Sequence, residues 1–300
     1  MMSENQPTGV SLWIAGARPR TLPAAIVPVA VGAAAAVGHE TDVVWWRAAL
    51  ALVVSLALQV GVNYANDYSD GIRGTDDARR VGPLRLVGSG LAEPAAVKRA
   101  ATVAFAVAGG AGAVLALVVG PELWVVGAAC LLAGWTYTGG PRPYGYLGLG
   151  EVFVFVFFGL VATIGTTYVL VEEITSLSAF ASVSVGLWAT AILVINNLRD
   201  IPGDTQAGKN TLAVRIGASA TRVVYIALQL LALALAVTTS IVHDRLAGLM
   251  VVFGLAFVIQ ACVDVGKGTS GRALVKVLGL TGQVQLISGL AFAAGLAISA

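Results

Sequence analysis

The sequence predicts an all-α integral membrane protein that forms a single domain, residues 1–300, and crosses the bilayer with nine helices. Hydrophobic residues make up 57% of the 300 residues and charged residues only 11%, whereas a soluble domain carries about 25% charged residues. The apolar runs are continuous and do not alternate with polar residues, which excludes membrane β-strands. Inside a bilayer, each such run satisfies its own backbone hydrogen bonds only as a helix.

Nine windows without a charged residue approach or exceed the roughly 20 residues that a helix needs to cross a bilayer. They are 21–38, 48–66, 100–121, 123–141, 152–171, 174–198, 223–242, 246–263 and 277–300. The first follows Arg18 and Arg20, and no cleavage motif ends it, so we expect a retained helix rather than a signal peptide. In the third, the small residues of 107–114 are typical of close contacts between membrane helices. The second and sixth each end in an Asn- and Asp-rich segment, and a Tyr- and Gly-rich loop joins the fourth to the fifth.

The positive charges predict how these helices are oriented. With the N-terminus on the cytoplasmic side, every Lys and Arg except Arg47 and Arg245 falls in an inside segment, as the positive-inside rule requires. Nine spans then place the C-terminus outside. We therefore expect a multi-pass protein in the lipid bilayer of a bacterial cytoplasmic membrane. A net charge of only +2 suggests that nucleic acid is not a partner.

Two polar clusters lie at predicted inner helix ends, at 63–70 and at 196–204. Asn63, Asp67 and Asp70 are spaced at i, i+4 and i+7, so they share one helix face. In the second cluster Asn196, Asp200 and Asp204 line up in the same way, provided that the helix persists through Pro202 and Gly203. Both contain Asn-x-x-x-Asp, which hints at a duplicated four-helix unit, 21–141 and 149–263, with the helix 277–300 outside the repeat.

The acidic side chains of these clusters have three possible roles: solvated charges at the membrane edge, an ion pathway, or a metal–diphosphate site. Two carboxylates about 4 Å apart repel by roughly 4 kcal/mol at an effective dielectric of 20, which a shared cation would relieve. Carboxylate and amide oxygens are hard ligands suited to Mg²⁺, which proteins usually hold together with substrate phosphates. Basic residues that suit a diphosphate follow both clusters: Arg73, Arg79, Arg80, Arg85, Lys209 and Arg215.

The clusters and the residues that follow them resemble the paired Asp-rich motifs of the UbiA superfamily of intramembrane prenyltransferases. The matching segments are 63–74 and 196–215. Within the superfamily, Gly82-Pro-Leu-Arg85 and the Tyr- and Gly-rich stretch 137–151 are similar to the branch that prenylates 1,4-dihydroxy-2-naphthoate in menaquinone biosynthesis. Other branches keep a lysine in that stretch, where this chain has Gly145.

The resemblance implies a role for each matching residue. Those implied to hold Mg²⁺ are Asn63, Asp67, Asp70, Asp200 and Asp204, and those implied to bind the diphosphate are Arg73, Arg85, Arg142 and Lys209. The catalytic set comprises Asp67 and Asp200 with Tyr137, Tyr144 and Tyr146 of the loop. Some branches carry a basic residue at the position of Asp70.

The implied reaction transfers a polyprenyl group from polyprenyl diphosphate to 1,4-dihydroxy-2-naphthoate, releasing CO₂ and diphosphate and giving demethylmenaquinol. The implied cofactor is Mg²⁺, and the implied active site is cytoplasmic. One alternative is a related prenyltransferase whose acceptor is homogentisate, 4-hydroxybenzoate or a glycerol-phosphate ether. Another is a transporter, which the absence of ionisable residues inside the spans disfavours. A purely structural membrane protein would have no use for two matched Asn/Asp clusters.

Overall fold

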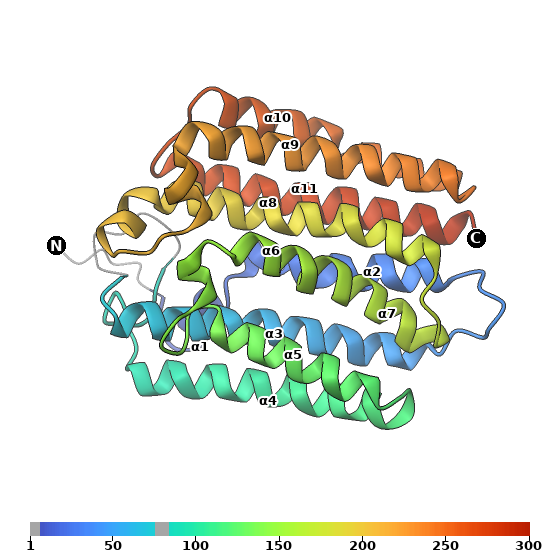
Figure 1. Cartoon of the computed structure of the whole chain (residues 1–300), viewed down its shortest axis with the longest axis horizontal. Coiled ribbons are helices and arrows are strands. Elements are labelled where there is room, and N and C mark those ends of the chain that lie inside the picture. The colour runs from blue at the N-terminus through green and yellow to red at the C-terminus, as the bar shows by residue number, and fades with distance from the viewer. Residues whose placement is uncertain (1–6, 76–83) are drawn as a thin grey trace.

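In the computed structural model, which describes residues 7–75 and 84–300, every regular element is helical. The long helices lie side by side with nearly parallel axes, and the C-terminus lies at the end of the bundle opposite to the ends of α3 and α8 (Figure 1). The elements are α1 (Val10–Ala17), η1 (Pro19–Thr21), α2 (Pro23–Ala36), α3 (Trp45–Ile72), α4 (Pro94–Val118), α5 (Glu122–Thr136), η2 (Tyr144–Leu147), α6 (Gly150–Val154), η3 (Phe155–Val161), α7 (Ala162–Val171), α8 (Ser176–Gln206), α9 (Leu212–Val242), η4 (Leu246–Gly254), α10 (Leu255–Gly266) and α11 (Ala273–Ile298).

All nine charge-free windows are helical, but they are not equally able to cross a membrane. Within the described ranges, 7 continuous helices are long and apolar enough to span, and the pair Val10–Thr21 and Pro23–Ala36, bent by 55°, would make 8. The predicted span at 123–141 is a helix of 15 residues, because α5 ends at Thr136 before the glycine-rich loop begins. The ninth span therefore stays a prediction, as does the internal repeat.

Helix α8 is the central element of the fold and carries the second polar cluster. Thr175 starts it as an N-cap, its hydroxyl accepting a hydrogen bond of 3.1 Å from the Ser178 amide. The helix continues through Pro202 to Gln206, so Asp204 lies on it one turn after Asp200. The helix therefore persists through Pro202 and Gly203, which is what the alignment of Asn196, Asp200 and Asp204 requires. Midway along α8, Trp188 is fully buried in a core formed with α2, α9, α10 and α11.

Glycines allow two close helix contacts beside this core. A Cβ atom on Gly159 of η3 would collide with the backbone of Gly186 in α8, and one on Gly32 of α2 would collide with the carbonyl of Thr163. In 107–114, where close contacts were expected, Gly110 instead faces open space and Gly112 has only ordinary contact distance. Gly112 also lines a cavity, beside Val54 of α3.

Candidate active site

A cavity of about 610 Å³ runs between the helices, with α3 and α8 on opposite walls. Charged side chains, among them Asp70 and Lys209, line one end, where α3 and α8 finish. Leu115, Leu123 and Val169 line it near the opposite end of the bundle. On α3 the lining extends from Ala51 to Asp70, which is about 28 Å of helix at 1.5 Å per residue. The cavity is therefore deep and amphipathic, with one polar mouth and a long apolar remainder.

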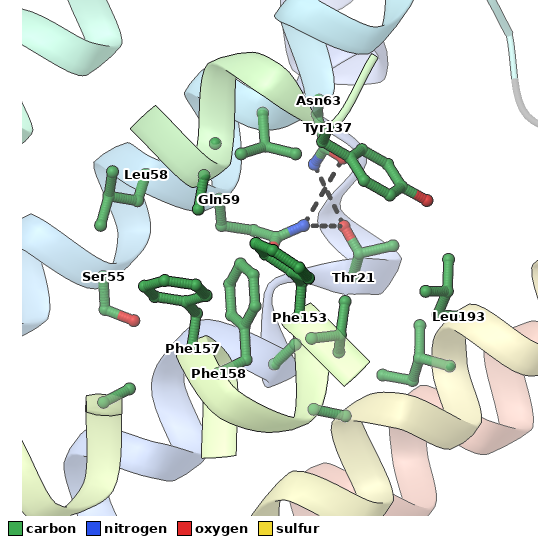
Figure 2. Close-up of a pocket in the computed structure, with 18 of the residues that line it drawn as sticks. Thr21, Ser55, Leu58, Gln59, Asn63, Tyr137, Phe153, Phe157, Phe158 and Leu193 are labelled. Atoms are coloured by element: carbon green, nitrogen blue, oxygen red, sulfur yellow. Dashed lines mark hydrogen bonds between the residues drawn. The ribbon is translucent and has the colours of Figure 1, made fainter. Parts of the chain in front are cut away.

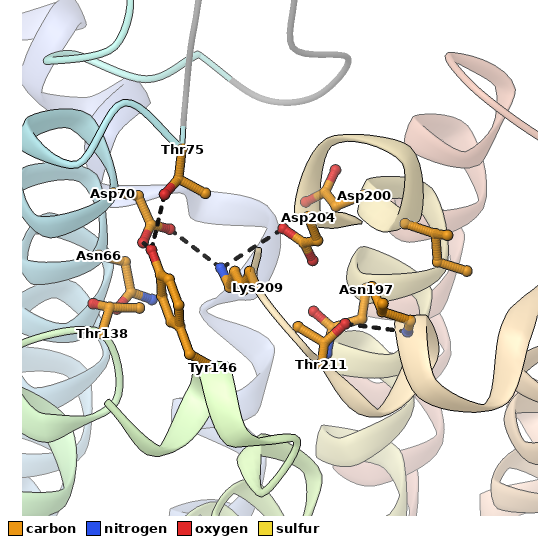
Figure 3. Close-up of polar contacts among 12 residues, drawn as sticks. Asn66, Asp70, Thr75, Thr138, Tyr146, Asn197, Asp200, Asp204, Lys209 and Thr211 are labelled. Atoms are coloured by element: carbon orange, nitrogen blue, oxygen red, sulfur yellow. Dashed lines mark hydrogen bonds and ion pairs between the residues drawn. The ribbon is translucent and has the colours of Figure 1, made fainter. Parts of the chain in front are cut away.

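At the polar mouth, the ammonium of Lys209 lies between two carboxylates that come from opposite walls (Figure 3). Its Nζ is 3.3 Å from Oδ2 of Asp70 on α3 and 3.9 Å from Oδ1 of Asp204 on α8. Burial lowers the pKa of Lys209, but the two carboxylates outweigh this and raise the pKa above its ordinary value. Lys209 is therefore cationic at neutral pH, and it holds together two acidic groups that would otherwise repel each other.

Tyr146 connects this ion group to the loop between α5 and α6. Its hydroxyl donates a hydrogen bond of 2.8 Å to Oδ1 of Asp70, and Lys209 Nζ lies 5.1 Å from the centre of its ring. Burial and the neighbouring Asp70 carboxylate raise the pKa of the Tyr146 phenol, so it stays protonated as a donor. Arg73 donates to the carbonyls of Thr138 and Gly140 and lies 5.4 Å from the same ring, which ties the loop to α3.

Two amides belong to the same polar mouth (Figure 3). Asn66, one turn before Asp70 on α3, accepts a hydrogen bond of 2.7 Å from the Thr138 hydroxyl. Asn197 on α8 donates a hydrogen bond of 2.9 Å to the buried carboxylate of Glu151. Both amides are thus held in fixed orientations by the elements that follow α5, and both line the cavity.

Asp200 is held by its neighbour in the chain. Arg199 donates from Nε to Oδ1 at 2.8 Å and from Nη2 to Oδ2 at 2.7 Å, a two-point ion pair. The side chain of Arg199 is only 1% exposed, and both residues line the cavity. The carboxylate of Asp200 is therefore balanced by its own neighbour in the chain, whereas that of Asp70 is balanced by Lys209 from another segment.

Aromatic rings form the cavity wall next to the polar mouth. The rings of Tyr137 and Tyr144 lie 5.4 Å apart, and Tyr144 stacks on Phe153 at 3.9 Å. Phe153 in turn lies 5.9 Å from Phe157, and these two, with Tyr137, face the cavity in Figure 2. Burial raises the pKa of Tyr144, whose hydroxyl donates to the carbonyl of Ala133. This wall is electron-rich and carries no charge.

Two residues that the sequence assigned to the metal lie outside the ion group. Asp67 is fully buried, and its two carboxylate oxygens accept hydrogen bonds from the amides of Leu86 and Val87, at 2.7 and 3.0 Å. Asn63 donates to the carbonyl of Ala17 and to Thr21 (Figure 2). Asn63, Asp67 and Asp70 lie on one side of α3, but each contacts a different segment of the chain. Asn63 and Asn66 both line the cavity.

The predicted diphosphate residues lie at different distances from the ion group. Lys209 is part of it, Arg73 is joined to it through Tyr146, and Arg85 lines the cavity. Arg142 is exposed on the loop. Arg79 and Arg80, with Gly82 and Pro83 of the branch motif, fall outside the described residues. The residues that the sequence did not single out are Asn66, Asn197 and Arg199, although all three lie inside the two polar clusters.

The polar mouth has donors that suit a divalent cation. Across residues 7–75 and 84–300, no three His, Cys, Asp or Glu side chains converge closely enough to form a metal site by themselves. However, the Lys209 ammonium shows that a cation is accommodated between Asp70 and Asp204. Proteins usually bind Mg²⁺ through one or two carboxylates together with substrate phosphates. Two carboxylates, of which Asp70 lines the cavity together with the amides of Asn66 and Asn197, match that requirement.

Comparison with known proteins finds relatives along nearly the whole chain. Residues 25–273 match the profile of the UbiA prenyltransferase family. A 1,4-dihydroxy-2-naphthoate octaprenyltransferase of Mycobacterium tuberculosis is 50% identical over 285 residues, which covers 95% of this chain and 96% of that protein. The protein of the same name from Escherichia coli is 38% identical over 229 residues, which covers 72% of each chain.

Solved structures share the arrangement of the helices at low sequence identity. A UbiA homolog from Aeropyrum pernix K1 has a TM-score of 0.69 at 18% identity, with 93% of this chain and 97% of that chain covered. A UbiA homolog from Archaeoglobus fulgidus, bound to GPP and Mg²⁺, has a TM-score of 0.65 at 13% identity, with 94% and 99% covered. The likeness thus extends over nearly the whole bundle.

Proposed function

The chain belongs to the UbiA prenyltransferase family, and we propose that it transfers a polyprenyl group from polyprenyl diphosphate to 1,4-dihydroxy-2-naphthoate. CO₂ and diphosphate are released, and the product is demethylmenaquinol, an intermediate of menaquinone biosynthesis. The observation that carries the proposal is the cavity itself. Its charged mouth suits a diphosphate, its aromatic wall suits an allylic cation, and its apolar depth suits an isoprenoid tail. The identity to the naphthoate enzymes supports the choice of acceptor.

Mg²⁺ would be held by Asp70 and Asp204, with Asp200 and the amides of Asn66 and Asn197 around them. When bound, the ion supplies Lewis-acid stabilisation of the charge that develops on the leaving diphosphate. This set differs from the one implied by the sequence resemblance, since Asn66 takes the place of Asn63 and Asp67 has a structural role.

The side chains around the mouth prepare the diphosphate for departure. Lys209 and Arg85 line the cavity and provide fixed positive charge near the leaving group. Arg73 and Tyr146 hold the 138–146 loop against α3, and Tyr146 also orients the Asp70 carboxylate. Arg142, exposed on the same loop, is available to the diphosphate from the solvent side.

The bond changes take place at the aromatic wall. The C–O bond to the diphosphate breaks, and Tyr137, Tyr144 and Phe153 offer ring faces that stabilise the allylic cation. The ring carbon of the acceptor that bears the carboxylate forms the new C–C bond. The bond to the carboxyl carbon then breaks, its electron pair returns to the ring, and CO₂ leaves. The apolar lining below the wall excludes water, which would otherwise capture the cation.

An acceptor screen tests the proposal directly. Detergent-purified protein with Mg²⁺ and polyprenyl diphosphate should release CO₂ from 1,4-dihydroxy-2-naphthoate, and mass spectrometry should detect the prenylated naphthalenediol. Homogentisate and 4-hydroxybenzoate serve as competing acceptors in parallel reactions. Product from one of these and none from the naphthoate would contradict the assignment.

The apolar depth of the cavity predicts how tail length is limited. Gly127 of α5 lines the cavity, and a Cβ atom added there meets nothing within 4 Å. Gly127→Leu should therefore occupy tail space without disturbing the fold, lowering kcat/KM for long polyprenyl diphosphates by about tenfold while sparing geranyl diphosphate. Gly110→Leu is the matched control, since Gly110 also faces open space but lies outside the cavity lining. Equal losses for short and long donors would refute this location of the tail.

The protein is a multi-pass membrane protein, and we propose nine spans with the active site on the cytoplasmic side of a bacterial plasma membrane. The distribution of Lys and Arg supports this orientation. A reporter fused after Gly208 should read cytoplasmic, and one at the C-terminus should read external. A cytoplasmic C-terminus would show that one predicted span, such as α5, does not cross.

A further inference from the structure

Arg199 lines the cavity and carries one guanidinium nitrogen that has no hydrogen-bond partner among the described residues. Its Nε and Nη2 are paired with Asp200, while Nη1 is buried and has no hydrogen-bond partner among residues 7–75 and 84–300. The side chain is 1% exposed, so bulk water does not replace the missing partner. A buried guanidinium nitrogen without an acceptor is unfavourable, so a ligand oxygen that reached Nη1 would gain a charge-assisted hydrogen bond.

The chemistry of the guanidinium and its ion pair with Asp200 restrict which ligand group could bind Nη1. A guanidinium selects the planar oxygens of carboxylates and phosphates. Under the proposed function, the cavity receives two such anions, the diphosphate and the carboxylate of the acceptor. The diphosphate gains charge as it leaves and is best served by a cation that carboxylates compensate little, such as Arg73, which contacts the carbonyls of Thr138 and Gly140 and the ring of Tyr146.

The acceptor carboxylate has the opposite requirement. It must be held in place, yet it has to give up its negative charge to the ring as CO₂ departs, and a strong uncompensated cation would oppose that loss. Arg199 has its charge balanced by Asp200 at 2.7 Å, so Nη1 can donate hydrogen bonds with little net positive field. It therefore suits a carboxylate that must be positioned and then released.

We propose that Nη1 of Arg199 binds the carboxylate of the aromatic acceptor and so selects acceptors that carry one next to the reacting carbon. This inference rests on the proposed function and adds to it a residue that recognises the acceptor. Arg199 acts by binding and placing the acceptor ring against the aromatic wall.

Steady-state kinetics of Arg199→Gln and Arg199→Lys test the inference, with Arg222→Gln as the control. Arg222 lies on α9 at the same end of the bundle and donates to the carbonyls of Gly268 and Thr269 outside the cavity. Arg199→Lys retains a cation beside Asp200, so it preserves the fold if the neutral variant does not. We expect KM for 1,4-dihydroxy-2-naphthoate to rise about 10- to 100-fold in both variants, with KM for the polyprenyl diphosphate within about twofold.

A second measurement separates the carboxylate from the diphosphate as the ligand. Wild-type protein should prefer 1,4-dihydroxy-2-naphthoate over 1,4-dihydroxynaphthalene, which lacks the carboxylate, by about tenfold or more in kcat/KM, and Arg199→Gln should abolish this preference. A raised KM for the diphosphate with the preference intact would overturn the inference and assign Nη1 to the diphosphate. Unchanged kinetics in both variants would also overturn it. Failure of the proposed function itself would show separately, as no turnover of the naphthoate by wild-type protein.

Discussion

Asp70→Asn should lower turnover of polyprenyl diphosphate by about 10³-fold, a loss on the order of 4 kcal/mol of transition-state stabilisation, while leaving the melting temperature nearly unchanged. Asp70 is the carboxylate from the α3 wall that contacts both Lys209 and Tyr146 at the polar mouth. Asparagine keeps its shape and its ability to accept from Tyr146 but removes the charge that a cation requires. Turnover with radiolabelled diphosphate and thermal unfolding in detergent measure the two effects.

Asp67→Asn is the matched comparison, because the family resemblance implies a metal role for Asp67, whereas we propose a structural role from its hydrogen bonds to the Leu86 and Val87 amides. The substitution replaces one acceptor oxygen of the pair that binds the Leu86 and Val87 amides, so it should lower the melting temperature and reduce turnover by less than about tenfold. If Asp67→Asn abolished turnover without a change in melting while Asp70→Asn stayed active, the roles proposed here for the two carboxylates would be wrong.

Lys209→Gln should change cation binding and turnover in opposite directions. In the protein without substrate, the Lys209 ammonium lies between Asp70 and Asp204 and competes with a divalent cation for them. Its removal should tighten binding of Mn²⁺, measured by EPR without diphosphate, by about tenfold. Turnover should nevertheless fall by about 100-fold, because the diphosphate loses a preorganised positive charge.

Lys276→Gln controls for the loss of one positive charge at this end of the bundle. Lys276 is exposed near the start of α11 and lies outside the cavity lining, so its replacement should leave both measurements unchanged. Weaker Mn²⁺ binding in Lys209→Gln would show that Lys209 supports the cation site rather than competing for it.

Helix placement could be predicted from the sequence, because a bilayer imposes a simple rule on hydrophobic length. All nine charge-free windows are helical, and both polar clusters lie at the same end of the bundle. Two local features of the helices could not be predicted from the hydrophobic pattern. α5 stops at Thr136, which leaves it at 15 residues, and α8 continues past Pro202, where the sequence left the outcome open.

The side-chain partners within the clusters could be predicted only in part. Spacing places Asn63, Asp67 and Asp70 on one side of α3, but it carries no information about which loop packs against each residue. The segment at 84–91 supplies the backbone amides that Asp67 accepts from, and the loop after α5 supplies Tyr146 for Asp70. Nothing in the sequence of the clusters distinguishes Asp67, which binds the 84–91 segment, from Asp70, which binds Tyr146.

The sequence by itself determined that the chain is a helical membrane protein with two acidic clusters and a chemistry suited to a diphosphate, because composition and periodicity are local properties. Only the tertiary structure decided which residues of those clusters meet. Asp70 is separated from Lys209 by 139 positions in the chain, although Asp204 and Lys209 are near neighbours. The pairing of Arg199 with Asp200 leaves Nη1 of this cavity-lining residue without a hydrogen-bond partner among the described residues. Contacts of this kind depend on how helices rotate and how loops pack against them, and neither is encoded in the spacing of any one segment.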